Sequence, residues 1–233
     1  MPTSSPLLIL IRDELIGYAR SKVMLVLWIL MPVIAIAGYL VLPASLTAKA
    51  GLPFQLTATM YMSAMTSMLA GTIAAVVVAV DIVSERSRKV YDLFAIRPLR
   101  RESLIWSKFV AVFACVSIAC VIAIAIGLGI DLARGAMPTG GILQDVARSL
   151  ATLAGVIALS TAAGVFIGIL SRTSIVAAVI LVLQVGQMLP IVPLLPGFLG
   201  VLPDQFWIVM AISFALTALL VHGAAVMFRR AEL

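Results

Sequence analysis

Residues 109–130, FVAVFACVSIACVIAIAIGLGI, form a long run that contains no charged side chain. A helix needs about 20 consecutive apolar residues to cross the hydrocarbon core of a bilayer, and this run is long enough. It also lacks the alternation of apolar and polar residues that membrane β-barrel strands require. The run therefore predicts a transmembrane α-helix and an all-α fold.

The rest of the chain repeats this pattern. Of its 233 residues 63% are apolar and only 11% are charged, whereas soluble domains contain about 25% charged residues. The other uncharged runs lie at 23–48, 50–80, 149–171, 173–203 and 205–228. The sequence thus predicts one polytopic transmembrane domain over residues 1–233, with six transmembrane helices.

Prolines divide the fifth of these runs. Pro190, Pro193, Pro196 and Pro203 occupy its second half, and helix interiors tolerate proline poorly. We expect one span that ends near residue 189, followed by a re-entrant segment over 189–206 that dips into the membrane surface before the last span.

The N-terminus does not have the pattern of a cleavable signal peptide, because its apolar stretch PLLILI is cut short by Arg12, Asp13 and Glu14. Apolar residues instead recur at helical spacing, with the charges expected on the opposite face. The recurring residues are Leu7, Leu8, Ile11, Leu15 and Tyr18. This pattern predicts an interfacial helix within residues 1–21 that anchors the chain at the cytoplasmic surface.

The distribution of basic residues predicts the orientation. Of the 16 Lys and Arg residues, only Lys49, Arg134 and Arg148 lie in the loops on the other side from the termini. Because cytoplasmic loops carry the excess of Lys and Arg, we expect both termini in the cytoplasm. Topology and contact with anionic membrane lipids account for the net charge of +6, so no nucleic-acid partner is predicted.

The residue inventory argues against an enzyme. The sequence has no phosphate-binding loop of the form GxxxxGK[ST]. Its one histidine, His222, falls in the last predicted span, so we expect no His-based triad and no His/Cys/carboxylate metal set. Cys115 and Cys120 read as small core residues that are too far apart on one helix for a disulfide. We therefore expect no metal, no bound cofactor and no catalytic residues.

Gly164 and Gly168 form a small-residue surface, which predicts close contact between helices.

Charge is dense only in DIVSERSRKVYDLFAIRPLRRESLIWSK, residues 81–108. Val90, Leu93 and Phe94 mark an apolar face there, and Pro98 ends the pattern. The segment therefore predicts an amphipathic cytoplasmic helix over 84–100. Its apolar face suits either anionic lipid at the membrane surface or a groove on a partner protein.

These residues resemble the type-2 ABC transporter permeases, which are six-span exporter subunits. The matches to the family motif E-R-E-x-G-T-L-E-x-L-L-x-x-P-x-x-R and its following lysine are Glu85, Arg86, Asp92, Leu93, Phe94, Pro98, Arg101 and Lys108. The chain departs at Lys89 and Val90, where the family has Gly-Thr, and at Ser107, where it has Gly. GVFIGILSRTS, residues 164–174, resembles the family's turn between spans four and five, and residues 189–207 resemble its re-entrant segment.

The resemblance implies a mechanism. The cytoplasmic helix would be a coupling helix that docks on a separate ABC ATP-binding subunit, and a second permease subunit, identical or paralogous, would complete the pathway. The docking residues that the resemblance implies are Glu85, Arg86, Asp92, Leu93, Phe94 and Pro98. This chain would bind no cofactor itself, since ATP and Mg would sit on the partner subunit. The expected location is the cytoplasmic membrane of a prokaryote.

Similar exporters line the pathway with spans two and five. Polar residues recur on one side of these two spans in this chain: Thr59, Ser63 and Thr66 in span two, and Gln184 and Gln187 in span five. Hydrogen bonding between helices is the alternative role for such residues. No ionisable residue is expected deep in the membrane, so the predicted substrate is lipophilic or amphipathic: a lipid, a drug or antibiotic, or a peptide.

Three other functions compete with an ABC exporter. A secondary carrier or channel would need no ATPase partner, but it usually has ionisable residues at mid-membrane or paired broken helices. A subunit that only passes signals to a periplasmic partner is disfavoured because the external loops 44–55 and 131–147 are short. A membrane enzyme comes last because catalytic residues are missing.

Overall fold

The computed structural model of the chain describes residues 6–41, 58–88, 101–133, 140–171, 175–184, 188–196 and 203–230. Every regular element in these ranges is a helix, which confirms the all-α prediction. The elements are α1 (Pro6–Ala19), α2 (Lys22–Val41), α4 (Ala58–Ser87), α6 (Arg101–Ala133), α7 (Gly140–Leu170), α8 (Ile175–Gln184), the 3₁₀ helix η1 (Leu189–Leu194) and α10 (Pro203–Arg230).

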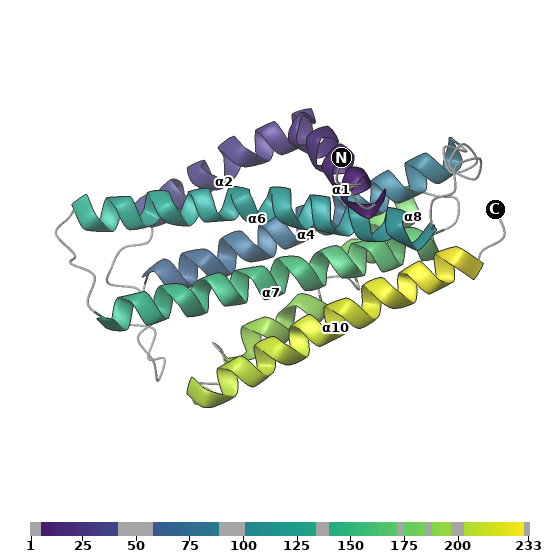
Figure 1. Cartoon of the computed structure of the whole chain (residues 1–233). Coiled ribbons are helices and arrows are strands. Elements are labelled where there is room, and N and C mark those ends of the chain that lie inside the picture. Colours follow the sequence, from purple (N-terminus) through teal and green to yellow (C-terminus); the bar gives the residue numbers. More distant parts are fainter. Residues whose placement is uncertain are drawn as a thin grey trace, which may run out of the picture.

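The long helices lie side by side, and the chain runs back and forth along the bundle that they form (Figure 1). The last turns of α4, the first turns of α6 and the end of α10 all lie at one end of this bundle, and α1 lies toward the same end. We call it the charged end, because Asp81, Glu85 and Lys108 are located there.

Four described helices are long and apolar enough to cross a membrane: Thr66–Ser87, Glu102–Ile126, Val146–Leu170 and Gln205–Arg230. The segments Leu7–Ala19 and Lys22–Ile34 qualify only as a pair, which is bent by 66°. The prediction of six spans is thus confirmed only in part, as four or five. The predicted fifth span is not among them, because its described helix α8 covers ten residues and Pro190 and Pro193, which follow it, lie in the 3₁₀ helix η1.

A serine starts the second of the two bent helices. The backbone N–H of Met24 donates to Ser21 Oγ at 3.2 Å, so Ser21 satisfies one of the free amides at the start of α2. Farther along α2, Trp28 Nε1 donates to the carbonyl oxygen of Cys115 at 3.1 Å. This bond attaches α2 to the middle of α6.

Glycines on α7 allow close contact with α4, as predicted. A Cβ added to Gly164 would lie 2.6 Å from Ala75 Cα and even closer to the Ala75 carbonyl oxygen. A Cβ on Gly168, one turn later, would lie 3.0 Å from Ala79 Cα. Small residues at such contacts let helix backbones approach each other without a hydrophobic driving force, which the membrane does not supply.

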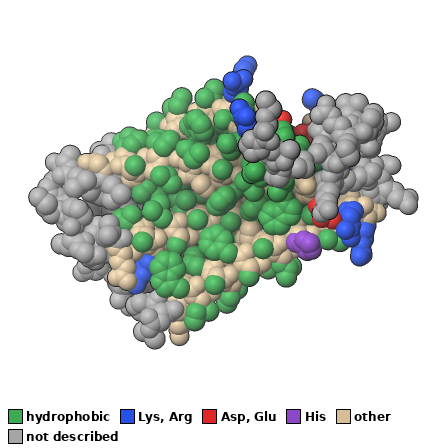
Figure 2. Space-filling model, viewed as in Figure 1, with side chains coloured by type: hydrophobic (Ala, Val, Ile, Leu, Met, Phe, Trp, Pro, Cys, Tyr) green, Lys and Arg blue, Asp and Glu red, His purple; other side chains and the backbone are tan. Residues whose placement is uncertain are grey.

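Large apolar side chains also cover much of the face of the bundle that Figure 2 shows. On α10 the side chains of Trp207, Ile208 and Leu219 are each more than half exposed, and so is that of Ile29 on α2. Water would penalise so much apolar surface, whereas lipid accepts it. Cys115 and Cys120 are buried and free in the interior, as predicted. The chain is a multi-pass membrane protein.

The segment before the last span packs against the bundle. Pro190, Pro193 and Leu194 of η1 are buried, and a Cβ on Gly155 of α7 would lie only 3.1 Å from Pro193 Cβ. Residues 197–202 of the predicted re-entrant segment lie outside the described residues, so its path relative to the membrane surface stays a prediction.

Candidate functional site at the charged end

A lysine is buried near the start of α6. The side chain of Lys108 is only 1% exposed, and it lies among the buried residues Leu104, Ile105 and Val112 of the same helix. An ammonium group taken out of water in this way needs charged partners to offset its lost hydration.

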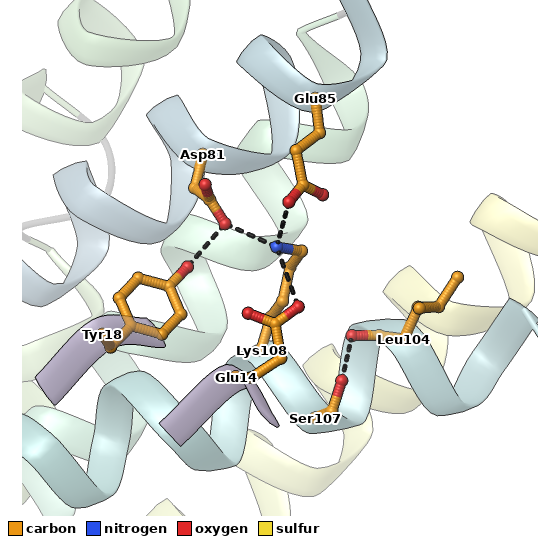
Figure 3. A network of polar contacts seen from close by, with 7 residues as sticks. All are labelled: Glu14, Tyr18, Asp81, Glu85, Leu104, Ser107 and Lys108. Carbon is orange, nitrogen blue, oxygen red and sulfur yellow. Dashed lines mark hydrogen bonds and ion pairs between the residues drawn. The ribbon is translucent and has the colours of Figure 1, made fainter. Parts of the chain in front are cut away.

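Three carboxylates supply those partners (Figure 3). Lys108 Nζ lies 2.6 Å from Asp81 Oδ2, 2.8 Å from Glu85 Oε1 and 3.2 Å from Glu14 Oε1. Asp81 and Glu85 are four residues apart on α4, which places them on one face of that helix. Glu14 comes from α1, so this lysine joins α1, α4 and α6.

A tyrosine completes the group. The hydroxyl of Tyr18 donates to Asp81 Oδ2 at 2.5 Å, the same oxygen that accepts from Lys108. Tyr18 lies one turn after Glu14 on α1, and its ring is buried against the core. We refer to Glu14, Tyr18, Asp81, Glu85 and Lys108 as the Lys108 cluster.

The Lys108 cluster holds more negative than positive charge. Its single ammonium faces three carboxylates whose side chains are 24–32% exposed, so water still reaches the acids. The acids converge on the ammonium, and the part of the chain that the structure describes contains no His/Cys/Asp/Glu group arranged to hold a metal ion. The arrangement holds α1, α4 and α6 together through ion pairs.

Asp81 is 32% exposed and contacts both Lys108 and Tyr18. One sequence-based expectation about this cluster is wrong. The face of α1 that was expected to be purely apolar also carries Glu14, and Leu7 and Leu8, which were placed on it, are exposed. The pairing with Lys108 offsets the cost of turning Glu14 inward.

Arg86 connects α4 to the end of α7. Its Nη1 donates to the carbonyl oxygen of Ile169 at 3.1 Å. Ile169 is in the last turn of α7, where carbonyl groups have no partner within the helix and the helix dipole favours a cation. The two segments that resemble family motifs, around residue 85 and over 164–174, are therefore in contact.

Ser107 shows how the chain accommodates a departure from the family pattern. The side chain is fully buried, and its hydroxyl donates to the carbonyl oxygen of Leu104 at 2.9 Å. A buried polar group costs little when it is hydrogen-bonded in this way. A serine can therefore stand beside Lys108 without needing water.

Only some of the predicted docking and pathway residues are among those that the structure describes. Glu85 and Arg86 have the contacts given above, whereas Asp92, Leu93, Phe94 and Pro98 lie outside the described residues, as does most of the predicted coupling helix. Thr66 is buried within the subunit and Gln184 is exposed on α8, which packs against α4. The side chains of Thr59 and Ser63, and residue Gln187, are not described.

The sequence marked Lys108 as a motif match without a role, placed Tyr18 on the apolar face of the N-terminal helix, and placed Glu14 among the charges of the opposite face. The available signal was the pair of acids at i and i+4 at the end of one apolar run, with a lysine at the start of the next. Such a pattern indicates that the lysine has partners, but it does not identify α1 as the source of the third acid.

A second ion pair at this end of the bundle serves as a contrast. Arg229 Nη1 lies 2.9 Å from Glu102 Oε1, but the Arg229 side chain is 59% exposed. Exposed pairs contribute about 0–1 kcal/mol. We expect Arg229→Gln to lower the apparent melting temperature of the purified protein by less than about 2–4 °C, the shift that 1 kcal/mol produces in a chain of this size. A larger loss would show that this pair is shielded from water.

Comparison with known proteins identifies the family to which the sequence is similar. The sequence pattern of the ABC-2 family transporter proteins matches residues 45–221, which is most of the chain and includes α4, α6, α7 and α8. No curated protein matches the chain.

Proposed function

The chain belongs to the ABC-2 transporter family, and from this premise we propose that it is the membrane-spanning permease subunit of an ATP-driven exporter. It would move a lipophilic or amphipathic substrate across the cytoplasmic membrane of a prokaryote. A separate ABC subunit would bind ATP and Mg, and a second permease, identical or paralogous, would complete the pathway. Both termini would lie in the cytoplasm.

The Lys108 cluster is the observation that supports this proposal. Residues 89–100 follow directly on α4, and the last turns of α4 are attached to α1 and α6 through Lys108 and to α7 through Arg86. A load applied at the predicted coupling helix would therefore reach four helices at once. A surface helix that only binds lipid would not need to be fixed to the bundle in this way.

The permease itself performs no covalent chemistry in this proposal. ATP binding closes the partner subunits, and the energy of that closure shifts the spans between two packed arrangements. The contribution of this chain is mechanical: it receives the movement at the charged end and passes it along α4, α6 and α7.

The docking step can be tested at Phe94, which the resemblance places on the apolar face of the coupling helix. Phe94→Ala is expected to weaken binding of the ATP-binding subunit by about 2 kcal/mol or more, roughly 30-fold, as for a central aromatic residue of an interface. The measurement is the amount of ATP-binding subunit that copurifies with tagged permease from detergent-solubilised membranes as its concentration is varied.

Phe214→Ala is the matched control, because Phe214 lies mid-way along α10 and is 43% exposed, out of reach of a subunit outside the membrane. It should leave copurification unchanged. Glu85→Ala is a weaker probe, since it would also break the pair with Lys108. Equal capture by the Phe94 and Phe214 variants would show that Phe94 is not part of the docking surface.

The proposed pathway residues are Thr59, Ser63 and Thr66 on α4, with Gln184 on α8 and the nearby Gln187. The packing of α8 on α4 supports a shared polar surface between these two elements. Every described ion pair lies at the charged end, which supports a substrate with extensive apolar surface and no strong fixed charge.

The Lys108 cluster also favours one other function, a secondary carrier or channel. Asp81 and Lys108 lie within candidate spans, and ionisable residues in spans are what ion-driven carriers use. The copurification experiment separates the two functions. Failure of the wild-type permease to bring down any ATPase, from cells that express candidate subunits, would favour the carrier.

A further inference from the structure

The contacts of α1 point to more than an anchor. One face of this helix carries Glu14 and Tyr18, four residues apart and therefore side by side. Glu14 pairs with Lys108 of α6, and Tyr18 donates to Asp81 of α4. Both contacts lie at the charged end, close to Glu85, which belongs to the first turn of the coupling helix predicted over 84–100.

The backbone of α1 packs mainly on α6 and makes few contacts with α2, although α2 follows it directly. Leu10 and Leu15 add apolar contacts with the core. Among the described residues, the hydrogen bond from Tyr18 to Asp81 joins α1 directly to α4. Through Lys108, Glu14 is additionally linked to both acids of α4.

The opposite face of α1 is exposed. Leu8, Ile9 and Ile16 are apolar there, and Arg12 and Arg20 carry positive charge. Such a face suits the boundary between lipid tails and anionic head groups. The helix therefore has one side whose composition suits the membrane surface and one side attached to the end of α4.

We propose that Glu14 and Tyr18 are positioning residues that make α1 a moving part of the ATP-driven cycle, because they tie it to the end of α4 that receives the movement of the ATP-binding subunit. This inference rests on the proposed function. Packed junctions with ionic contacts switch between discrete arrangements instead of deforming gradually. When the end of α4 moves, α1 therefore moves with it as long as both contacts hold.

The test is hydrogen–deuterium exchange of the complete complex, with permease and ATP-binding subunit together, in the absence of nucleotide and after trapping with Mg-ATP and orthovanadate. In the wild type, peptides from α1 and from the last turns of α4 should both change their exchange on trapping. In Glu14→Gln/Tyr18→Phe the change in α1 should be lost, while the change at the end of α4 persists and Lys108 keeps Asp81 and Glu85.

Asp13→Asn is the matched control, because Asp13 is the neighbouring acid of α1 and is exposed; it should keep the wild-type response. A purely structural role for Glu14 and Tyr18 would raise α1 exchange equally in both nucleotide states and leave the difference between them intact. The single variants Glu14→Gln and Tyr18→Phe, which each retain one contact, should keep part of the response even if the double variant does not assemble.

The outcomes separate this inference from the proposed function. If no ATP-binding subunit assembles with wild-type permease, the proposed function fails. If the complex assembles and hydrolyses ATP but α1 shows no response to trapping, α1 is only an anchor and the inference is overturned. The inference is also overturned if the double variant or both single variants keep the full response, because α1 would then move without these two contacts. Selective loss of the α1 response supports it.

Discussion

Replacing Lys108 with methionine is expected to lower the free energy of unfolding by about 3 kcal/mol. Removal of one partner from a buried ion pair costs roughly 3–5 kcal/mol, because it leaves uncompensated charge behind. Here it leaves three carboxylates facing one another. The expected loss is at the low end of that range, because the acids are 24–32% exposed and keep some hydration. The measurement is thermal unfolding of the purified protein in detergent, monitored as the loss of its monodisperse fraction on heating.

Two further variants test this explanation. Lys22→Met removes an exposed lysine at the start of α2 and should change stability by less than about 0.5 kcal/mol, as surface substitutions usually do. Adding Asp81→Asn to Lys108→Met should recover part of the lost stability, because it removes one of the stranded charges. Equal tolerance of Lys22→Met and Lys108→Met would contradict the ion-pair role of Lys108.

Gly164→Ala should cost about 2–3 kcal/mol, although alanine ordinarily stabilises a helix relative to glycine. The added Cβ would lie 2.6 Å from Ala75 Cα, and backbone atoms cannot move aside as a flexible side chain would. The helices α4 and α7 must separate instead, with the loss of contacts that overpacking of a core typically causes. Thermal unfolding in detergent measures the effect.

Glycines elsewhere on the helices supply the controls. Gly223 of α10 and Gly17 of α1 have nothing within 4 Å of an added Cβ, so Gly223→Ala and Gly17→Ala should be neutral or stabilising by up to about 1 kcal/mol. Gly168→Ala, where the nearest atom would be 3.0 Å away, should fall between them and Gly164→Ala. If Gly164→Ala were as stable as Gly223→Ala, this would contradict the close approach of α4 and α7 at Gly164.

Several features were predictable because they depend on local composition. Long uncharged runs predicted helices at α4, α6, α7 and α10, since only a helix satisfies its own backbone hydrogen bonds inside lipid. The spacing of Gly164 and Gly168 predicted a close helix contact, because residues four apart lie on one face. The clustered prolines after residue 189 predicted the end of a regular helix.

The number of spans was less predictable. An uncharged run shows where a helix is permitted to cross, but it does not show where the helix ends or bends. Between α1 and α2 the chain turns by 66°, and a residue count cannot detect such a bend. Four or five of the six predicted spans are confirmed, since α2 qualifies only together with α1 and the predicted fifth span is represented by the ten-residue α8.

Composition thus determines that this chain is a helical membrane protein and where its long uncharged segments lie. Spacing determines which helix faces pack closely. The tertiary structure alone decides that Lys108 pairs with acids from two other helices, 23 to 94 residues away in the chain, and that α1 belongs to this junction. The physical reason is that a buried charge is tolerated only when the fold brings oppositely charged partners into contact with it. Whether these partners lie near Lys108 depends on how α1, α4 and α6 pack against one another. No local sequence pattern in any one of these helices encodes that packing.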